Sequence, residues 1–484
     1  MDRFVDPAEL VELLGDWSSR DGPLYRRLAD ALRQVIADGA VGRDDRLPAE
    51  RVLAGALSVS RATVVGAYDA LRDTGEVATR RGSGTRVGGP VGRPRPDGRV
   101  KGGRATSVFQ RLVDRPDDTI SLALAVEPAI PQLREALADL VERDLGHLLT
   151  DVGYHPGGLP ALRAAVAEHH TALGVPTGPE QVLVTTGAHQ ALGLVGEVYL
   201  ARGATVLVES PSWPGCLDVF RARGATAVGV PIDDEGIRPD RLADALAAHR
   251  PDLVYVMPTF NNPTGTLTSR GRRARLAELA ARHGVPVLED NAYSTGPAAH
   301  PPVAAFATGG AEILSVGSLA KSVWAGLRIG WVRADRQVID RLARRKALAD
   351  LGSPVLDQAL AARLLPRLAE LTAAREAAVA DRLAHLETLL RDRLPSWDWR
   401  RPDGGSALWI RLPDTDAAVF AQVALRHGVE IVPGSAMDPG GRHDDHIRLP
   451  FTFPVEVLDT LVGRLERAWR ELTRDGTGDP RPVV

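Results

Sequence analysis

The distribution of hydrophobic and polar residues divides the chain into two regions. In the larger one, from residue 119 to about residue 472, short apolar runs alternate with helical stretches rich in Ala, Leu and Arg; the runs are QVLVTT, TVLVES, LVYVMP, VPVLED and EILSVGS. Short apolar runs are typical of buried strands, and strands that alternate with helices form parallel sheets. We therefore predict an α/β domain with a mostly parallel sheet over residues 119–475.

The first 88 residues show helical spacing and then a hairpin signal. The apolar positions of the first predicted helix are Leu24, Leu28, Leu32, Val35 and Ile36. A second helix begins in RLPAERVLAGAL, with Pro48 near its first turn, and Ser60 can cap a third helix, RATVVGAYDALRDTG. The stretch EVATRRGSGTRVGG indicates two strands with glycines at the turn. Three helices followed by a basic hairpin predict an α+β winged helix-turn-helix domain over residues 1–88.

A basic stretch rich in Gly and Pro separates the two regions. From residue 79 to residue 111 there are nine Lys or Arg residues and one Asp, and the middle of the stretch has no apolar period. Such a composition cannot bury a core. We predict a linker over residues 89–118 and a polar tail over residues 476–484.

The overall composition narrows the class of protein. A hydrophobic content of 44% and a charged content of 25% over 484 residues are those of a globular protein with more than one domain. The net charge of −3 carries no global signal for nucleic acid, so any such signal is local. The single cysteine, Cys216, cannot form an internal disulfide, and neither a signal peptide nor a membrane span is indicated. We expect a cytoplasmic protein and predict no metal site.

Arginines mark the side of the winged helix that can face DNA. Arg61 lies at the start of the third helix, the end that a recognition helix presents to bases and phosphates. Arg51 on the second helix could reach the DNA backbone, and Arg80, Arg81 and Arg86 in the hairpin could enter an adjacent groove. The alternative from pattern alone is a helical oligomerisation domain with solvated arginines.

Residues 23–87 resemble the GntR-type DNA-binding domain, because the pattern LPAER…VSR.TV…Y..L…G……GSGT.V is nearly complete. The resemblance implies that the DNA-contacting positions are Arg51, Arg61, Thr63 and Gly82. Val65 stands where some members carry an arginine, which implies a smaller set of base-reading side chains.

Lysine is scarce in this chain. Three lysines stand beside 56 arginines (59 Lys and Arg minus three). Lys101 lies in the linker, and Lys346 lies on an arginine-rich helical stretch where we expect a solvated charge. Lys321, in GSLAKSVWAGLRIGW, follows an apolar run in a loop of small residues. An arginine can replace a surface lysine but cannot form an imine, so Lys321 is a candidate for imine chemistry. The alternative is an ordinary phosphate-binding or surface lysine.

Other residues after apolar runs suit an anion and an aromatic cofactor. Ser318, Arg328 and the helix N-terminus at Gly187, Ala188 and His189 suit a phosphate. Asp290, at the end of a strand, could hold a protonated ring nitrogen, or it could cap a helix. Asn262 could donate to a phenolate, or form a common turn, and Trp213 could stack on a ring, or pack a loop.

The order and spacing of Gly187, Trp213, Asn262, Asp290, Lys321 and Arg328 resemble those of fold-type I pyridoxal-phosphate enzymes of the aminotransferase superfamily. The resemblance covers residues 119 to about 472 and implies a smaller C-terminal subdomain and pyridoxal 5′-phosphate as cofactor. It implies that Lys321 forms the imine, that Asp290 pairs with the ring nitrogen, and that Asn262 and Tyr293 bind the phenolic oxygen. Phosphate contacts are implied for Ser318, Arg328 and the amides of Gly187, Ala188 and His189, and ring stacking for Trp213.

The same resemblance implies a dimer and a carboxylate site. Tyr154 matches a tyrosine that reaches the partner subunit's phosphate, and Arg448 matches the arginine that binds a substrate carboxylate. The alternative for Arg448 is a strand-end ion pair. Two positions depart from the pattern, since Ala325 stands where many relatives have proline and His189 where many have glutamine.

The two domains in this order resemble the MocR subgroup of GntR regulators, which are commonly head-to-tail dimers. The resemblance implies a transcriptional regulator in which an amino compound replaces Lys321 on the cofactor, binds Arg448, tilts the smaller subdomain and changes the spacing of two winged helices on operator DNA. One alternative is an active aminotransferase with a vestigial DNA-binding domain. Another is a sensor of pyridoxal phosphate itself.

Overall fold

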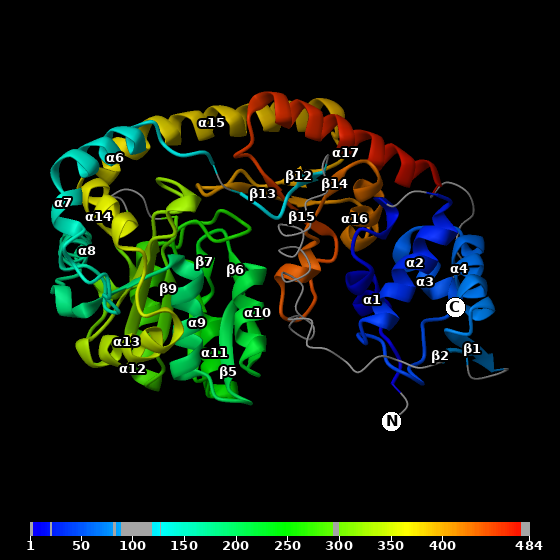
Figure 1. Cartoon of the computed structure of the whole chain (residues 1–484), viewed down its shortest axis with the longest axis horizontal. Helices are drawn as coiled ribbons and strands as arrows, with labels where there is room; N and C mark the ends of the chain where they lie inside the picture. The colour runs from blue at the N-terminus through cyan, green and yellow to red at the C-terminus, as the bar shows by residue number, and fades with distance from the viewer. Residues whose placement is uncertain are drawn as a thin grey trace.

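The computed structural model describes residues 3–19, 22–80, 84–88, 119–125, 127–293 and 300–475. Figure 1 shows a large α/β part on the left, a smaller C-terminal subdomain in the middle beneath two long helices, and the N-terminal domain on the right. The predicted division into a winged helix and an α/β domain with a smaller subdomain is confirmed.

The N-terminal domain contains the three predicted helices and the predicted hairpin. Its elements are α1 (Pro7–Leu14), η1 (Trp17–Ser19), α2 (Leu24–Ala37), α3 (Glu50–Leu57), α4 (Arg61–Asp73), β1 (Val77–Arg80) and β2 (Gly84–Val87). Ser60 caps α4, as predicted, because its Oγ accepts the N–H of Thr63 at 3.2 Å. The hydroxyl of the buried Tyr68 donates to the carbonyl of Pro48 at 2.9 Å, which ties α4 to the start of α3. The short helix α1 was not predicted.

The large part is built on an eight-stranded sheet in the order β4-β11-β10-β9-β8-β5-β6-β7. The strands are β4 (Val182–Thr185), β5 (Thr205–Ser210), β6 (Thr226–Asp233), β7 (Gly236–Ile237), β8 (Leu253–Val256), β9 (Val287–Asp290), β10 (Ile313–Ser318) and β11 (Gly330–Arg333). All five apolar runs form strands, and the sheet is parallel except where β11 and β7 pair with their neighbours.

Helices cover both faces of this sheet. Alternate residues of β5 point to opposite faces of the sheet. Val206 packs with three of the helices given below (α9, α10 and α13), and Leu207 packs with two others (α11 and α12). The helices and turns of this part are α6 (Gln132–Arg143), α7 (Leu145–Leu148), α8 (Pro160–Ala172), η2 (Pro179–Gln181), α9 (Gly187–Tyr199), α10 (Pro214–Ala222), α11 (Pro239–His249), α12 (Arg270–His283), η3 (Val303–Phe306), η4 (Ala325–Leu327), α13 (Arg336–Asp350), α14 (Val355–Leu364) and η5 (Leu365–Arg367).

The C-terminal subdomain takes its strands from both ends of the α/β region. Its elements are β3 (Ile120–Ser121), α15 (Leu368–Arg393), β12 (Asp398–Trp399), β13 (Ala407–Arg411), α16 (Ala417–Arg426), β14 (Val429–Glu430), η6 (Gly434–Met437), β15 (His446–Pro450) and α17 (Val455–Asp475). Strand β3, the first element after the predicted linker, pairs in parallel with β14, and Leu122 is buried in this subdomain's core. The chain therefore enters the α/β region through the smaller subdomain.

The N-terminal domain packs on this subdomain of the same chain. Helix α3 lies against α16, and the guanidinium of Arg426 donates to the carbonyl of Ser58, in the turn between α3 and α4, at 3.3 Å (Figure 1). Within the described ranges, no helix combines the length and apolarity needed to cross a membrane.

The prediction for Lys346 is wrong. Its side chain is 0% exposed, and Nζ lies 2.6 Å and 2.8 Å from the two carboxylate oxygens of Asp350, one helical turn later. The ion pair lets the lysine be buried in a helix whose other cations face solvent, because burial of an unpaired charge is costly.

Candidate functional site

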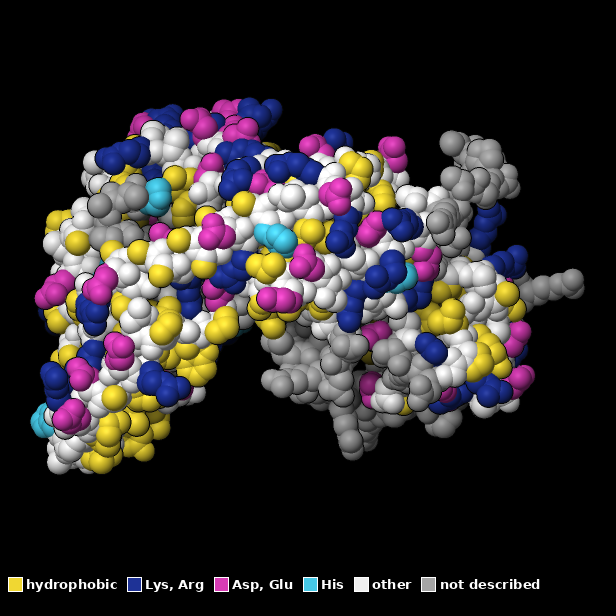
Figure 2. Space-filling model, turned by 90° about the horizontal axis from the view of Figure 1, so that it is seen from above, with side chains coloured by type: hydrophobic (Ala, Val, Ile, Leu, Met, Phe, Trp, Pro, Cys, Tyr) yellow, Lys and Arg dark blue, Asp and Glu magenta, His cyan; other side chains and the backbone are white. Residues whose placement is uncertain are grey.

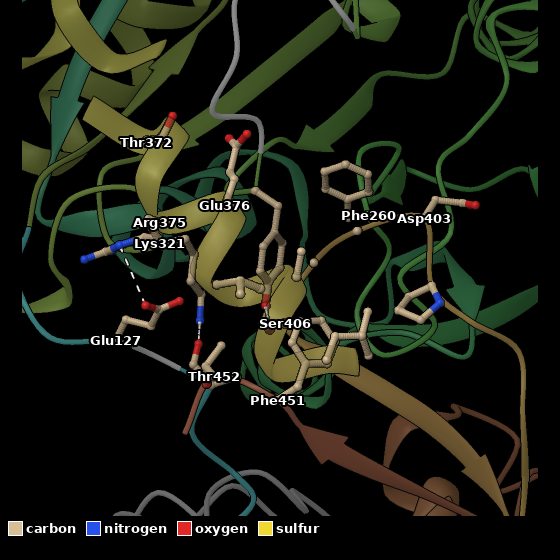
Figure 3. Close-up of a pocket in the computed structure, with 18 of the residues that line it drawn as sticks. Glu127, Phe260, Lys321, Thr372, Arg375, Glu376, Asp403, Ser406, Phe451 and Thr452 are labelled. Atoms are coloured by element: carbon tan, nitrogen blue, oxygen red, sulfur yellow. Dashed lines mark hydrogen bonds and ion pairs between the residues drawn. The ribbon is translucent and has the colours of Figure 1, made fainter. Parts of the chain in front are cut away.

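Lys321 lies at the edge of a cavity between the large part and the smaller subdomain. It follows β10, its Nζ donates to the carbonyl of Ala125 at 2.6 Å, and it lies 5.4 Å from the ring centre of Tyr293. The cavity has a volume of about 450 Å³. Figure 3 shows Lys321, Arg375 and Glu127 on one side of it and Phe260 and Asp403 on the other. The amine is therefore within reach of a ligand held between the two parts of the domain.

Asp290 ends the neighbouring strand β9, which runs parallel to β10. Its carboxylate accepts hydrogen bonds from the hydroxyl of Tyr255 and the N–H of Ala292, each at 3.0 Å. Burial raises the pKa of Asp290 above its usual range, although these donors and the charge of Lys321 oppose the rise. A buried carboxyl of this kind is stabilised as an anion by a cationic N–H partner.

Asn262 and Tyr293 line the same narrow crevice, together with Phe260 and Ser406. The buried Oδ1 of Asn262 has no hydrogen-bond partner among the described residues and can accept a hydrogen bond, whereas the donor to a phenolate would be the Nδ2 group. The hydroxyl of Tyr293 lies 2.7 Å from Ser406 Oγ. Burial alone would raise the pKa of Tyr293, but the charges of Lys321 and Arg448 outweigh it and lower the pKa. The donors that could bind a negatively polarised oxygen are therefore the hydroxyl of Tyr293 and the Nδ2 group of Asn262.

The start of α9 forms a cradle for an anion. Gly187 follows β4 with a φ of +79°, and a Cβ at this position would lie 2.8 Å from the guanidinium of Arg328. Arg328 donates to the carbonyl of Thr186 at 3.3 Å. Although Thr186 is the N-cap residue of α9, its side chain makes no cap hydrogen bond, so the first N–H groups of the helix are not capped by it.

The remaining predicted contacts are arranged around this cradle. Ser318 Oγ accepts the N–H of Ala320 at 3.1 Å and lies 3.4 Å from the carbonyl oxygen of Ile329. The rings of Trp213 and His189 meet edge to face with centres 5.7 Å apart. Burial and the charge of Arg328 lower the pKa of His189, which favours a neutral ring beside the cradle.

Arg448, on β15, is buried and does not line the cavity around Lys321, but its charge acts on Tyr293, which does. It donates to the carbonyls of Leu122 and Ala123 at 3.3 Å and 3.1 Å, and its buried Nε has no partner. The strand-end ion pair that the sequence left open is not found within the described ranges. Its guanidinium retains a donor for a ligand carboxylate.

Tyr154 lies outside the cavity, in the loop between α7 and α8, with 68% of its surface exposed. Its predicted contact with a partner subunit stays a prediction. The turn at Gly352 supports this loop, because a Cβ at Gly352 would lie 2.9 Å from the carbonyl oxygen of His155.

Of the predicted DNA-binding residues, Arg51 and Arg61 are exposed on the N-terminal domain, and Thr63 and Arg86 are half-buried. The side chain of Arg61 is 68% exposed and pairs with Glu50 at 3.0 Å, Arg51 is exposed on α3, and Thr63 Oγ1 lies 2.9 Å from Ser60 Oγ. Arg86 on β2 donates to the carbonyl of Asp44 at 3.0 Å. Two predicted residues, Arg81 and Gly82, lie outside the described residues, as does the side chain of Arg80.

Sequence reasoning missed several residues that hold the site together. Arg375 donates to the carbonyl of Lys321 at 3.0 Å and also to that of Pro128, while Glu127 pairs with Arg382 at 2.9 Å. Tyr255, which holds Asp290, was detectable as a hydroxyl in the apolar run LVYVMP. For the arginines the sequence offers no signal, because their partners are more than fifty residues away.

An amine, a buried carboxyl and an anion cradle at neighbouring strand ends define a fold-type I pyridoxal-phosphate protein, and pyridoxal 5′-phosphate is its cofactor. The profile of the aminotransferase class I and II family matches residues 126–465, and that of the bacterial regulatory proteins of the gntR family matches residues 24–87. The chain therefore belongs to the aminotransferase class I and II family, joined to a GntR domain as in the MocR subgroup.

Relatives of both kinds support this assignment. The chain is 31% identical over 454 residues to the uncharacterized HTH-type transcriptional regulator YisV of Bacillus subtilis, covering 90% of this chain and 93% of that one. It is 31% identical over 338 residues to the probable rhizopine catabolism regulatory protein MocR of Rhizobium meliloti, covering 67% and 68%. The structure of LysN, the α-aminoadipate aminotransferase of Thermus thermophilus complexed with N-(5′-phosphopyridoxyl)-L-leucine, is similar with a TM-score of 0.67 and 31% identity, covering 76% of this chain and 95% of that one.

Proposed function

We propose that this protein is a DNA-binding transcriptional regulator in which an amino compound, bound with pyridoxal phosphate in the α/β domain, controls operator binding. In this proposal Lys321 carries the cofactor, Asp290 holds the ring nitrogen, Asn262 and Tyr293 hold the phenolic oxygen, and Trp213 covers the ring. The phosphate is held by Ser318, Arg328 and the amides of Gly187, Ala188 and His189. Because its target is operator DNA, we expect it to act in the cytoplasm.

The observation that carries the proposal is that one short segment receives hydrogen bonds from both ends of the site. Lys321 donates to the carbonyl of Ala125, and Arg448 donates to those of Leu122 and Ala123. The segment, residues 119–125, follows the predicted linker directly. It includes β3, which pairs with β14. A ligand that engages Lys321 or Arg448 therefore competes with the backbone that leads to the N-terminal domain.

Binding of an amino acid would change both sets of contacts. When bound, the cofactor would supply an aldehyde carbon that reacts reversibly with primary amines, that of Lys321 or that of the amino acid. When Lys321 is released, its amine is free to donate to Ala125, and Arg448 turns its guanidinium toward the ligand carboxylate in a bidentate contact. The segment then loses hydrogen bonds at residues 122–123 and gains one at Ala125.

The contacts between domains provide a route from this segment to the winged helix. Strand β14 follows α16, α16 packs on α3, and Arg426 at the end of α16 donates to Ser58. A tilt of the smaller subdomain would therefore move α3 and the recognition helix α4. In a dimer such a tilt changes the distance between the two winged helices and thus the preferred spacing of half-sites.

Exposed apolar side chains on the large part favour a homodimer. Leu149, Val152, Tyr154 and Leu348 are each at least 68% exposed. Figure 2 shows hydrophobic side chains gathered at the end of the molecule where α7 and α8 lie, while charges of both signs are interspersed over the upper surface. We propose that this apolar surface forms the dimer, with Tyr154 reaching the partner subunit's phosphate and each DNA-binding domain lying over the other subunit's large part.

The test is a gel-shift assay with an operator fragment selected on the full-length protein from a random DNA library. A panel of amino acids is added to wild type and to Lys321→Ala, both loaded with pyridoxal phosphate. We expect an amino acid to change the DNA affinity of wild type and to leave Lys321→Ala unaffected. The exposed Arg345→Ala serves as control. A full response in Lys321→Ala would overturn the proposal.

A second candidate is an active aminotransferase, which the similarity to LysN favours. It predicts conversion of the cofactor to its pyridoxamine form with release of an oxo acid, which absorbance spectra and product analysis detect. A third reading, in which the cofactor itself is the signal, predicts DNA affinity that depends on pyridoxal phosphate without any amino acid.

A further inference from the structure

Lys346 is one of three lysines beside 56 arginines, and it is fully buried. Its ammonium contacts both oxygens of Asp350, whose side chain is 25% exposed. A lysine presents a compact charge on a flexible stem, whereas arginine presents a larger planar fork. The position therefore requires a small buried cation, although Lys346 does not line the cavity that contains Lys321.

Asp350 also contacts two residues at the start of α9. Its carboxylate accepts from Gln190 Nε2 at 2.6 Å and from the N–H of Gly352 at 3.0 Å, and Thr186 Oγ1 lies 3.4 Å away. Gln190 Oε1 accepts a hydrogen bond from the N–H of Thr186 at 2.7 Å. Gln190 is thus oriented at both ends, by Asp350 on one side and by the backbone of Thr186 on the other.

Thr186 is consequently bound through all of its polar groups. Its N–H donates to Gln190, its carbonyl accepts from Arg328, and its hydroxyl lies 3.0 Å from Ser353 Oγ. A threonine at the N-cap position usually turns its hydroxyl to accept the N–H of the second or third helical residue. In α9 those residues are Ala188 and His189, whose N–H groups are proposed to bind the cofactor phosphate.

We propose that the Lys346–Asp350 ion pair is a positioning element for the phosphate cradle: it holds Gln190 and Thr186 so that the threonine hydroxyl stays out of the anion site and the first N–H groups of α9 remain available. The inference rests on the proposed phosphate contacts of α9 and is independent of the identity of the amino compound.

The test compares two ligands that differ only in the phosphate. The affinities of the full-length, cofactor-free protein for pyridoxal 5′-phosphate and for pyridoxal are measured by equilibrium dialysis. We expect Lys346→Met to weaken binding of the phosphate ester by about 10- to 100-fold, the loss seen when a residue that supports a metal ligand is removed, and to change pyridoxal binding by less than about twofold. The neighbouring exposed Arg345→Met is the matched control and should change neither affinity.

A second variant separates positioning from a general loss of structure. If the freed hydroxyl of Thr186 caps α9 in Lys346→Met, then adding Thr186→Val, which has no hydroxyl, should restore most of the affinity for the phosphate ester. Equal weakening of both ligands in Lys346→Met, or no rescue by Thr186→Val, would overturn the proposal. If Lys346→Met does not fold, Asp350→Asn replaces it with the same expectations.

A third variant tests the cradle itself. Arg328→Ala should also lower the preference for the phosphate ester over pyridoxal. If Arg328→Ala lowers it and Lys346→Met does not, only the positioning role fails. If neither variant lowers it, the phosphate contacts proposed for α9 fail as well.

Discussion

The site around Lys321 and the DNA-facing surface of the N-terminal domain are built in opposite ways. Asp290, Asn262 and Arg448 are each at most 9% exposed and are placed by strands and by contacts from distant parts of the chain. Arg61 is largely exposed and held by one ion pair, and Arg51 is exposed on α3. The fold thus fixes the buried side chains, whereas the surface proposed to bind DNA consists of exposed side chains that are free to change rotamer.

The largest effect is expected from Asp290→Ala. It removes the carboxyl proposed to pair with the cofactor ring and leaves the buried hydroxyl of Tyr255 without its acceptor. Breaking a buried charge pair costs about 3–5 kcal/mol, so cofactor affinity should fall by about two to four orders of magnitude. Equilibrium dialysis measures this loss. The exposed Asp240→Ala should leave the affinity unchanged, and a loss below tenfold in Asp290→Ala would contradict the proposed pairing.

The next largest effect is expected on the pH dependence of the free energy of unfolding, to which the buried Glu209 contributes. Burial raises its pKa to about 7, although the N–H of Met257 and the amide of Asn261 oppose the rise. The folded state therefore holds this proton more tightly than the unfolded state, whose pKa is near 4.5. The contribution of Glu209 to stability should be largest below pH 4.5, fall by about 3 kcal/mol as the pH rises through 7, and then level off.

Glu209→Gln tests this prediction because glutamine does not titrate. Its free energy of unfolding, measured in urea from pH 4.5 to 7.5, should lack the decrease that Glu209 contributes to wild type. Glu278→Gln, an exposed carboxylate paired with Arg275, is the control and should keep the wild-type decrease. An unchanged profile in Glu209→Gln would show that the decrease has another origin.

On the DNA-facing surface, Arg61→Ala should weaken binding to the selected operator by about 1–3 kcal/mol and relax base preference at one position. Cofactor affinity should stay the same, because the ion pair that the structure describes for Arg61, with Glu50, lies on the N-terminal domain. Gel shifts on operator and single-base variants measure the change. Arg26→Ala, exposed on α2, should have no effect, and equal losses on all sequences would make Arg61 a backbone contact instead.

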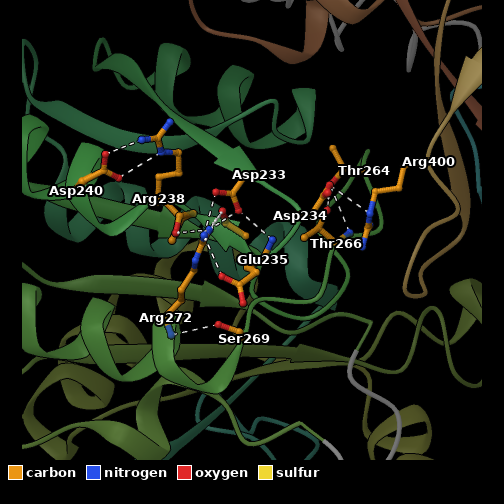
Figure 4. Close-up of polar contacts among 12 residues, drawn as sticks. Asp233, Asp234, Glu235, Arg238, Asp240, Thr264, Thr266, Ser269, Arg272 and Arg400 are labelled. Atoms are coloured by element: carbon orange, nitrogen blue, oxygen red, sulfur yellow. Dashed lines mark hydrogen bonds and ion pairs between the residues drawn. The ribbon is translucent and has the colours of Figure 1, made fainter.

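The smallest effect is expected where the two subdomains meet at the protein surface. Figure 4 shows Arg400 beside Asp234, in the turn between β6 and β7. Arg272 forms ion pairs with Asp233 and Glu235 at the same turn. Arg400 is 42% exposed and its ion pair with Asp234 measures 3.2 Å. Arg400→Ala should lower stability by less than about 1 kcal/mol, and the difference should vanish in 1 M salt. A larger or salt-independent loss in urea unfolding would mark a structural contact.

The sequence predicted those features that local pattern encodes. All five apolar runs form strands, Ser60 caps α4, and the scarce Lys321 lies at the cavity. Helix α1 and the contribution of β3 to the smaller subdomain were missed, because the partner strand of β3 lies about 300 residues away. Lys346 was misjudged for a related reason: the arginines around it suggested solvent, and neither its burial nor its link through Asp350 to Gln190 is visible in a linear pattern.

The hydrogen bonds that Lys321 and Arg448 donate to residues 122–125 have a thermodynamic consequence. If an amino acid changes operator affinity through these contacts, operator DNA must change the affinity for that amino acid by the same factor. A coupling of 1–3 kcal/mol, typical for such systems, corresponds to about 5- to 150-fold. Protein bound at its operator would then respond to a different range of amino acid concentrations from protein free of DNA, and the operator would act as an effector of the ligand site.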